Sequence, residues 1–553
     1  MMKRFEQFIH DILLNKSKKR LVLLVTLLAF IAAVMMFPTK IVLAKMLPGK
    51  STNTFSIYID LPSGSSHQQT QTVDNCVVSI LQKEKEITNM EVFNGMGAPL
   101  DYAGLVKGSS LRNGENLSEI VVNLTGIHER DERSYMMVHR LRPVLQKTCQ
   151  PLVDKTSIRM VEQPAGPPTM AAIVIEVYGE NTTQLRKLSE EIKSILATTK
   201  DLSDVDIMND DIYTKLSLRI DHEKALRAGL SIEQIHKMLY LGFEGMAVTH
   251  KNSATSPTQI PLFLVFSKDS KELEHLSKEE LLAKLSSVTL QNAQGLMVPL
   301  SEVVHVEEAA STPTIMSKNL QKMVSIVAEA DLVSQVYPLL DARAQIKEKL
   351  ANQYEIHNSH LFDLTLKDKQ SGEVFNLVWD GEMKVTMDTF RDLGAAFIAA
   401  LILIFLLMVI YYKSFSISGI ILLGSFLSII GVIFGHWVMD IFTKDTFFLT
   451  ATSLIGFISL MGISSRNSLL LIDFSMTLMQ KGMEKKRAIA VASATRAKPI
   501  LLTAAAIILA STLLASDPIF GGLGVALIFG TIAAVIVSLI FVPVLMDSAK
   551  DIH

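Results

Sequence analysis

Apolar residues in this chain form one short N-terminal run and a dense C-terminal block, with a long stretch of mixed polarity between them. The first run is Leu21 to Phe37, which continues weakly to about Leu43. From about Ala44 to Asp392 no segment is apolar for long enough to cross a hydrocarbon core about 30 Å thick. We therefore predict a first transmembrane helix over residues 20–43, after an N-terminal segment 1–19 that is charged and amphipathic.

The C-terminal block, residues 386–548, is predicted to cross the membrane several more times. Its apolar runs are Leu393 to Tyr412, Ile417 to Val438, Phe447 to about Met476, Pro499 to Ala515, and Gly521 to Met546. Each run is long enough for a transmembrane helix. Together with the first helix they predict six spans, in a one-plus-five arrangement.

Basic residues predict the orientation, because loops that stay in the cytoplasm carry an excess of Lys and Arg. With the N-terminus inside, the inner segments hold Lys3, Arg4, Lys16, Lys18, Lys19, Arg20, Lys413, Lys481, Lys485, Lys486, Arg487, Arg496 and Lys498. The outer loops hold Asp440, Lys444, Asp445 and Asp517. We expect both termini in the cytoplasm of an inner-membrane protein and the large insert outside.

The insert contains a repeated pattern of strands and helices. Its first unit, residues 44–168, has strand-like segments at 54–62, 91–95, 119–125 and 156–162, with helices at 66–85 and 131–148. The second unit, residues 169–210 and 309–385, has strands at 173–179, 205–208, 323–330 and 361–367, with helices near 183–199 and 333–351. Both patterns predict a ferredoxin-like βαββαβ unit, and the fold class is a membrane protein of α+β type.

An insertion interrupts the second unit over residues 211–308. It opens with a strand and then a helix, for which Ser231 and Gln234 stand in capping-box positions. We expect it to form a separate, docking-type domain.

Composition agrees with a protein that is partly in lipid and excludes several functional classes. Hydrophobic residues make up 49% of the 553 residues, and the net charge of -2 argues against a nucleic-acid partner. No hydrolase triad, P-loop or dinucleotide motif is present, so we expect a transporter without a cofactor rather than an enzyme. The two cysteines, Cys76 and Cys149, are too few for a zinc site; a disulfide and two buried thiols are both compatible with their positions.

Several C-terminal segments resemble one family of transporters. They are GEMKVTMDTFRDLGAAF (381–397), GFISLMGISSRNSLLLIDF (456–474), RAKPILLTAAAIILAS (496–511), DPIFGGLGVALIFG (517–530) and FVPVL (541–545). With the overall layout, they resemble the C-terminal half of a resistance-nodulation-division (RND) efflux permease of the hydrophobe/amphiphile type. Two features depart from that pattern: the chain has one half only, and the loop at 439–453 is longer and more charged than usual.

The resemblance implies a function and partners. The chain would be a half-size subunit of a proton-driven pump that exports amphiphilic solutes or drugs and contributes to multidrug resistance. Its partners would be a complementary N-terminal-half subunit, a periplasmic adaptor and an outer-membrane channel, in a trimeric assembly. The large insert would then be periplasmic.

Arg466 is the most informative single residue, because it lies in the middle of an apolar span beside Asn467. A guanidinium at the bilayer centre costs about 2.5 kcal/mol or more, so we expect Arg466 to face the bundle interior and to meet an anion. Arginine does not deprotonate in proteins, which suits it as a counter-charge for a carboxylate that takes up the proton. The alternative is an arginine whose head group extends to the interface.

Three further residues are assigned to proton coupling with Arg466. Asn467 adjoins it, and the resemblance implies a role for Thr503 on the next span. Asp473 lies seven residues after Arg466, about 10 Å along the helix. An interfacial Asp473 that meets Lys481 or water is the plainer alternative.

The loop FNGMGAPLDYAGLVKG (93–108) is the candidate solute-binding region, because the related permeases have a substrate-contacting loop there. Its candidate side chains are Met96, Leu100, Tyr102 and Leu105, and its four glycines suggest mobility. The stretch 163–169 (QPAGPPT) is a predicted hinge between the two units. An ordinary surface loop explains the same residues.

Three alternatives stay open at this point. Metal-ion efflux is suggested by the 26 methionines, since thioethers bind Cu(I), although no His or Met spacing marks a metal site. A protein-export accessory subunit shares the one-plus-five layout, but its outer domain is generally smaller. A scaffold that has lost transport is disfavoured because Arg466 is retained.

Overall fold

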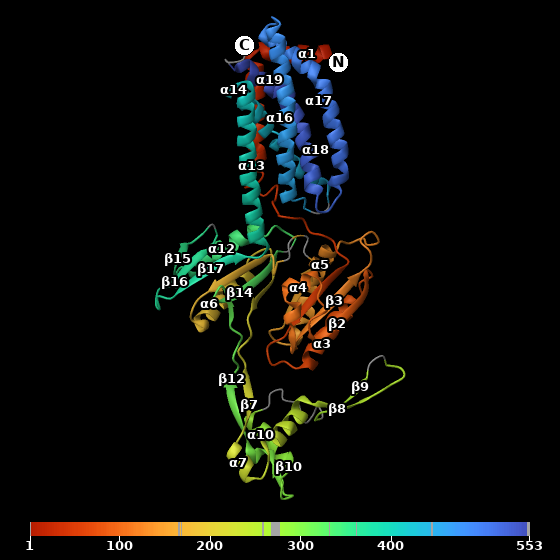
Figure 1. Cartoon of the computed structure of the whole chain (residues 1–553), viewed down its shortest axis with the longest axis vertical. Helices are drawn as coiled ribbons and strands as arrows, with labels where there is room; N and C mark the ends of the chain where they lie inside the picture. Colours follow the sequence, from red (N-terminus) through yellow and green to blue (C-terminus); the bar gives the residue numbers. More distant parts are fainter. Residues whose placement is uncertain are drawn as a thin grey trace. The chain divides into compact units, whose positions relative to one another are not determined.

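The computed structural model describes residues 2–163, 166, 169–256, 259–266, 277–330, 332–360, 362–443 and 446–549. The chain divides into two compact parts. The larger part comprises residues 1–60, 72–208 and 316–553, and the smaller part comprises residues 61–71 and 209–315. The larger part contains both α+β units and the helical block, and the smaller part contains the insertion (Figure 1).

The first α+β unit is a four-stranded antiparallel sheet with helices packed on it. Its elements are β1 (Thr54–Asp60), α3 (His67–Leu81), β2 (Ile87–Met96), α4 (Tyr102–Lys107), β3 (Asn113–Leu124), α5 (Ser134–Thr148) and β4 (Ser157–Glu162). The strand order is β2-β3-β1-β4. β1 lies inside the sheet, and five consecutive residues from Phe55 to Ile59 are buried, which explains their apolar character.

A disulfide joins the two long helices of this unit. Cys76 of α3 is bonded to Cys149, which directly follows α5, across 73 residues of sequence. The sequence was compatible with a disulfide or with two buried thiols, and the structure shows a disulfide. Because it closes a long loop, it restricts the unfolded chain strongly.

The second α+β unit is built on a seven-stranded sheet. Its elements are β5 (Ile173–Tyr178), α6 (Thr182–Ala197), β6 (Leu202–Met208), β13 (Met316–Lys318), β14 (Gln321–Ala330), α12 (Val336–Leu350), β15 (Tyr354–Asn358), β16 (Leu364–Asp368) and β17 (Val374–Asp380). The order is β13-β14-β5-β17-β16-β15, and β6 also pairs with β14. Leu188 and Ile192 of α6 and Leu339 and Ile346 of α12 share one core with these strands.

The end of this unit differs from the prediction. The segment 361–367 was expected as the closing strand, and β16 does lie there, but β17 is the strand that pairs with β5. β17 was missed because it contains the polar residues Asn376 and Asp380. The strands β15 and β16 therefore extend the sheet beyond a four-stranded unit.

The smaller part has its own core. Its elements are β7 (Thr214–Ile220), α7 (His222–Arg227), α8 (Ile232–Leu239), β8 (Met246–Lys251), β9 (Ile260–Leu264), α10 (Lys278–Ser287), β10 (Thr289–Gln291), β11 (Met297–Pro299), α11 (Leu300–Val303) and β12 (Val304–Ala310). β7 and β12 form an antiparallel ribbon. The predicted capping box of Ser231 and Gln234 is present at the start of α8.

Five long apolar helices follow the α+β units. Their elements are α13 (Glu382–Tyr412), α14 (Phe415–Phe426), α15 (Ile429–Phe442), α16 (Ala451–Gln480), α17 (Lys485–Ala515), α18 (Gly521–Ile536), a π-helical turn (Val537–Phe541) and α19 (Val542–Ser548). By length and composition, five stretches of the described residues are able to cross a membrane: α13, α14–α15, α16, α17 and α18–α19. They correspond to the five predicted runs.

The N-terminal segment contains two helices, α1 (Met2–Leu14) and α2 (Lys16–Met35). Asn15 separates them, and its side chain accepts a hydrogen bond from the Ser17 amide. The apolar part of α2, Leu21 to Met35, is about 22 Å long, shorter than the predicted span 20–43. A sixth span through α2 therefore stays a prediction.

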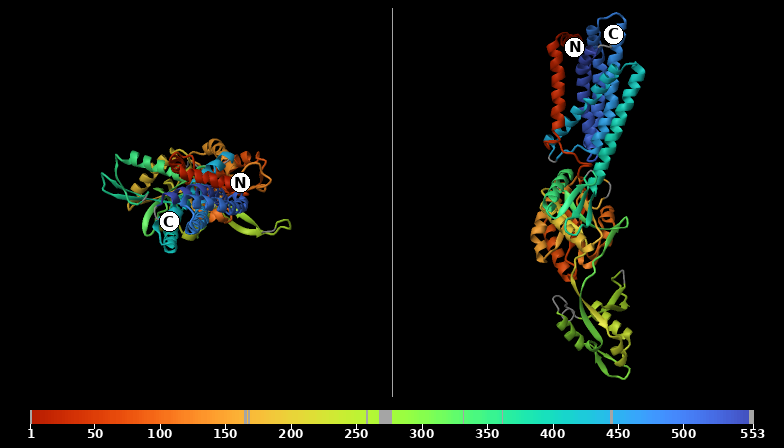
Figure 2. Two further views of the ribbon diagram at one scale, coloured as in Figure 1. Left: turned by 90° about the horizontal axis from the view of Figure 1, so that it is seen from above. Right: turned by 90° about the vertical axis from the view of Figure 1, so that its left-hand side faces the viewer.

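α1 and α19 lie at the same end of the helix bundle, and α2 runs beside the C-terminal helices (Figures 1 and 2). Lys19 of α2 forms an ion pair with Asp547 of α19 at 2.6 Å. The buried face of α1 (Ile9, Ile12 and Leu13) packs into the core that α14, α16 and α17 share.

Glycines allow the helices of this bundle to approach closely. A Cβ on Gly431 of α15 would lie 2.2 Å from the Phe529 carbonyl oxygen of α18, and one on Gly530 would lie 2.2 Å from a Leu460 methyl group of α16. Small residues at such contacts are typical of helix packing in membranes, where close van der Waals contact replaces the hydrophobic effect.

Candidate functional site

One face of α16 is exposed and carries both polar and apolar side chains. Its exposed residues are Ile455, Ser459, Gly462, Arg466, Leu470, Asp473 and Gln480. From Ile455 to Asp473 they recur every three or four residues and therefore form one stripe along the helix, which we call the α16 stripe. The opposite face, which includes Leu460, Ser464, Asn467, Ser468 and Leu471, is buried against the neighbouring helices.

Arg466 lies in the middle of the α16 stripe. Its side chain is exposed, so within this chain Arg466 does not face the interior of the helix bundle as expected. The anion that it is expected to meet stays a prediction. Among the residues that the structure describes, none is within hydrogen-bond or ion-pair distance of its guanidinium. The reason is geometric: neighbouring helices cover the other side of α16, and Arg466 lies on the uncovered side.

The other three predicted coupling residues are placed differently. Asn467 is 5% exposed and points into the chain, away from Arg466. Asp473 is exposed and shares the stripe with Arg466, two turns along the helix. Thr503 is half-buried on α17, where its hydroxyl donates to the Pro499 carbonyl at 2.9 Å. The structure thus brings Arg466 and Asp473 onto one face and leaves Asn467 off it.

A buried polar cluster in the bundle was missed. His436 of α15 is fully buried; its Nε2 lies 2.8 Å from Ser453 Oγ, and its Nδ1 lies 2.7 Å from the Val432 carbonyl oxygen. Ser453 Oγ is in turn 3.0 Å from Thr450 Oγ1. The signal in the sequence was the single histidine between Arg391 and Asp547, since ionisable residues in such segments are rare.

The predicted solute-binding loop carries an exposed apolar surface. Met96, Leu100, Tyr102 and Leu105 are between 51% and 63% exposed. The Tyr102 hydroxyl donates to the Gly166 carbonyl at 3.2 Å. Side chains of this kind, held outside the core, are able to contact an apolar solute.

Hydrogen bonds connect the loop to the sheet. Glu119 of β3 is buried, and its carboxylate accepts hydrogen bonds from the Ala98 amide at 3.0 Å and from the Ser109 hydroxyl at 2.5 Å. The glycines have conformational roles: a Cβ on Gly97 would lie 1.9 Å from the Ser109 carbonyl oxygen, and Gly108 has a φ of +88°. They therefore permit this geometry, where the sequence had suggested mobility.

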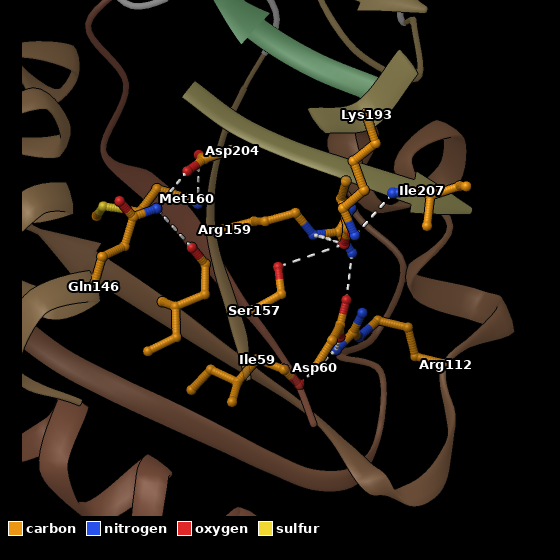
Figure 3. Close-up of polar contacts among 12 residues, drawn as sticks. Ile59, Asp60, Arg112, Gln146, Ser157, Arg159, Met160, Lys193, Asp204 and Ile207 are labelled. Carbon is orange, nitrogen blue, oxygen red and sulfur yellow. Dashed lines mark hydrogen bonds and ion pairs between the residues drawn. The ribbon is translucent and has the colours of Figure 1, made fainter. Parts of the chain in front are cut away.

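Ion pairs connect the two α+β units where β4 approaches β6 (Figure 3). Arg142 of α5 contacts Asp204 of β6 at 3.0 Å, and Arg159 of β4 contacts Asp206 at 3.4 Å. Gln146 donates to Asp204 at 2.9 Å. The network crosses from one unit to the other, so relative motion of the units at this place requires buried charges to separate.

The same network extends into the first unit through Asp60. Its carboxylate is held by Arg112 and Arg159. Burial opposes ionisation of Asp60, but the two guanidinium groups outweigh it and keep the pKa of Asp60 below its ordinary value. For Asp204, burial dominates and raises the pKa above the ordinary value despite the contact with Arg142.

A cavity of about 740 Å³ lies in the larger part, between the α+β units and the ends of the apolar helices. Residues from the linker after α2, the β3–α5 loop, the ends of β4 and β14, and the loops α15–α16 and α17–α18 line it. It is separate from the α16 stripe. The predicted hinge at 163–169 lies mostly outside the described residues, since only Gln163, Gly166 and Thr169 belong to them.

The family of this chain follows from a match to a family model. A model of the AcrB/AcrD/AcrF family matches residues 1–548. The chain belongs to this family. The family consists of RND permeases, so the resemblance that the C-terminal segments suggested is confirmed.

Curated relatives match part of the chain at low identity. The swarming motility protein SwrC of Bacillus subtilis (strain 168) is 28% identical over 384 residues, covering 67% of this chain and 32% of SwrC. The cobalt-zinc-cadmium resistance protein CzcA of Cupriavidus metallidurans is 22% identical over 337 residues, covering 60% of this chain and 28% of CzcA. The chain thus matches about a third of the length of these relatives.

The solved structures agree on the fold. A crystal structure of a heavy metal efflux pump (crystal form II) superimposes with a TM-score of 0.72 at 18% identity, covering 99% of this chain and 52% of that one. Crystal form I of a heavy metal efflux pump gives a TM-score of 0.71 at 17% identity. The fold is therefore that of an RND permease over about half of the neighbour's length.

No group of three or more His, Cys, Asp or Glu side chains suited to a metal ion occurs within the described ranges.

Proposed function

We propose that this chain is a half-size subunit of a proton-driven RND efflux pump and that it works together with a second, complementary half-transporter. The observation that carries the proposal is the α16 stripe. Arg466 and Asp473 lie exposed on an apolar helix, and lipid is a poor environment for either side chain. A neighbouring helix with carboxylates would give Arg466 the anion that the described residues of its own chain do not provide.

In this proposal Arg466 is the fixed counter-charge of the proton cycle. It attracts an ionised carboxylate on the partner and releases it when that carboxylate takes up a proton. Thr503 on the adjacent α17 provides a hydroxyl, and Asp473 serves the cytoplasmic end of the stripe. Asn467 acts only indirectly, by packing α16 against its neighbours.

Amphiphilic solutes or drugs are the substrates we favour. Support comes from the exposed apolar set Met96, Leu100, Tyr102 and Leu105, which lies on a loop that hydrogen bonds connect to the sheet. Both α+β units, which we interpret as ferredoxin-like from their strand orders, would frame the path of the solute.

Metal ions are the second candidate substrate. The relatives named for cobalt, zinc and cadmium resistance, and the solved heavy metal efflux pumps, favour this alternative. The match to a permease family over residues 1–548 gives the protein-export alternative no support.

The expected setting is the inner membrane, with both termini in the cytoplasm and the α+β units in the periplasm. The Cys76–Cys149 bridge supports this orientation, because disulfides form and persist in oxidising compartments. A trimer, a periplasmic adaptor and an outer-membrane channel are the further partners we propose.

The test is to purify the chain from its natural host in mild detergent and to identify what elutes with it. We expect a second RND half-subunit with acidic residues in one of its apolar helices. Arg466→Ala should abolish proton-coupled export while the chain still folds, and Arg466→Lys should retain part of it because a positive charge survives. Thr503→Ala should cause a milder loss.

Leu470→Ala, on the same stripe, is the matched control, and export should continue. A chain that exports drugs along a proton gradient as a homo-oligomer would contradict the need for a partner half. An Arg466→Ala variant that exports at the parent rate would contradict the coupling role.

A further inference from the structure

The cavity of about 740 Å³ has two chemically different walls. One wall comes from the ends of the apolar helices and their loops; it carries Met439, Phe447 and Phe448 next to hydroxyl side chains and Asp517. The other comes from the α+β units and the linker after α2, and it carries most of the charged side chains. A cavity with a partly apolar wall and a charged wall is able to hold an amphiphile, whose tail and head group have the same two properties.

Most charges on the polar wall already have partners. Lys107 contacts Glu329 at 2.6 Å, and Arg142 contacts Asp204 at 3.0 Å. Glu132 contacts Arg140 at 2.8 Å. These pairs are neutral as a whole and leave little attraction for a charged ligand.

Two basic side chains on this wall form no close ion pair among the described residues, although the carboxylate of Glu86 stabilises the charge of Arg130 electrostatically. Arg130 donates through Nη2 to Ser51 Oγ at 3.1 Å, but its Nε and Nη1 atoms are buried without a hydrogen-bond partner. Lys45 is half-buried, forms no ion pair, and has its ammonium group 5.5 Å from the centre of the Phe448 ring. A buried donor without an acceptor costs about 1–3 kcal/mol, and more when it is charged.

Glu162 is the one half-buried acid of the cavity wall without a partner among the described residues. Burial raises the pKa of Glu162 to about 7, and the negative charge of Glu329 of β14 acts in the same direction. Three positive charges lower the pKa but do not outweigh burial: Arg142 of α5, Lys107 of α4 and Lys45. Glu162 is therefore largely protonated just below neutral pH. In that state Glu162 does not offset the positive charges of Lys45 and Arg130, and the two other acids of the wall that form no ion pair among the described residues, Asp131 and Asp517, are exposed.

We propose that this cavity binds the anionic head group of an amphiphile, a phosphate, sulfate or carboxylate, between Arg130 and Lys45, with its apolar chain against Phe447 and Met439. Lys107 of the loop 93–108 lines the same cavity, but none of the exposed apolar residues of that loop does, and the site goes beyond the proposed export function. Two sources share this chemistry: an anionic membrane lipid and an anionic solute on its way out.

Binding is measured on the full chain in dodecyl maltoside by native mass spectrometry or calorimetry, so that transport is not required. The soluble probes are dodecyl phosphate and dodecyltrimethylammonium, which share one tail. Phosphatidylglycerol is the lipid probe, and phosphatidylcholine is its zwitterionic counterpart. We expect dodecyl phosphate to bind at least tenfold more tightly than the cation.

Arg130→Gln and Lys45→Gln should each weaken the binding of dodecyl phosphate at least fivefold. The matched control is Lys50→Gln, an exposed lysine five residues further along the same linker, which should bind as the parent does. Since Arg130 also fastens the β3–α5 loop, Lys45→Gln keeps the test valid if Arg130→Gln does not fold. Binding of dodecyl phosphate to the parent should weaken between pH 6 and 8, because Glu162 loses its proton. The Glu162→Gln variant should retain binding and should not show this weakening.

Tighter binding of phosphatidylglycerol than of dodecyl phosphate identifies the lipid as the source, and the reverse identifies a solute; both support the site. Preference for the cation, or equal binding of dodecyl phosphate to the parent, Lys45→Gln and Arg130→Gln, would overturn it. Because no transport is measured, failure here leaves the export function untouched.

Discussion

Arg142 and Asp204 form a buried ion pair between the two α+β units, with Nε and Oδ2 3.0 Å apart. The side chains are only 7% and 1% exposed. Asp204 also accepts hydrogen bonds from the Gln146 side chain and from the Met160 amide. The carboxylate of one unit is thus almost completely enclosed by groups of the other, so the units hold each other at this contact.

Asp204→Ala should destabilise the protein, because it removes the buried carboxylate that Arg142 contacts and leaves the hydrogen-bond donors of Gln146 and Met160 without this acceptor. Breaking a buried pair costs about 3–5 kcal/mol. We expect the thermal unfolding midpoint in detergent to fall by several degrees. The double replacement Arg142→Met with Asp204→Leu removes both charges and should recover most of that loss.

The matched control for this prediction is Glu223→Ala, which breaks the exposed pair with Arg227 at 3.2 Å. Exposed pairs contribute about 0–1 kcal/mol, so its midpoint should hardly move. Equal effects of Asp204→Ala and Glu223→Ala would show that the contact between the units contributes little.

The Cys76–Cys149 bridge should contribute substantially to the stability of the first α+β unit. Closing a loop of this length stabilises by about 4 kcal/mol in the chain-entropy account. Cys76→Ser combined with Cys149→Ser should lower the unfolding midpoint, and reductant should lower that of the parent to the same value. The sequence holds only these two cysteines, so thiol labelling of intact and reduced protein reports on this bridge alone.

Much of the fold was predictable because its elements have simple periodicities. The strand at 54–62 alternates and is buried, and β1 occupies Thr54–Asp60. The five apolar runs correspond to five membrane-spanning helical stretches, since lipid requires long apolar segments whatever their neighbours are. Such features depend on local sequence alone.

The features that the sequence did not predict depend on contacts between distant segments. The pairing of β17 with β5 joins residues about 200 positions apart, and nothing local in Val374–Asp380 indicates it. The outward direction of Arg466 follows from which faces of α16 the other helices cover. The role of Gly97 follows from the close approach of the Ser109 carbonyl oxygen, which leaves no room for a Cβ.

Glu162 should make stability depend on pH. Its pKa of about 7 in the folded protein lies above its ordinary value of 4.5, so between these values the folded state holds a proton that the unfolded state has lost. Its contribution to stability is therefore present below about pH 4.5 and is lost as the pH rises to 7. Glu162→Gln should flatten this decline and raise the unfolding midpoint at pH 8, whereas the exposed Glu129→Gln should change neither. A parent and Glu162→Gln variant with parallel pH profiles would contradict this assignment.

The solute preference should depend on the apolar surface of the loop at 93–108. Replacing Met96, Leu100 and Tyr102 together by serine removes side chains that are exposed and outside the core, so folding should be retained. An apolar solute loses most of its contact area on this loop, and binding weakens by about 25 cal/mol for each Å² of apolar surface no longer buried. The pattern of exported solutes should therefore shift while proton coupling through Arg466 continues.

The measurement for this loop is a susceptibility profile over a dozen unrelated drugs, in a pump-deficient host that carries both halves at equal protein levels. Replacing Leu226, Leu296 and Met297 by serine is the matched control, since these three side chains of the smaller part are also more than half exposed. The loop variant should change the rank order of the drugs, and the control should reproduce the parent profile. If both variants reproduce it, the apolar residues of the loop do not select the solute, and the metal-ion alternative gains weight because hydrated cations need no apolar surface.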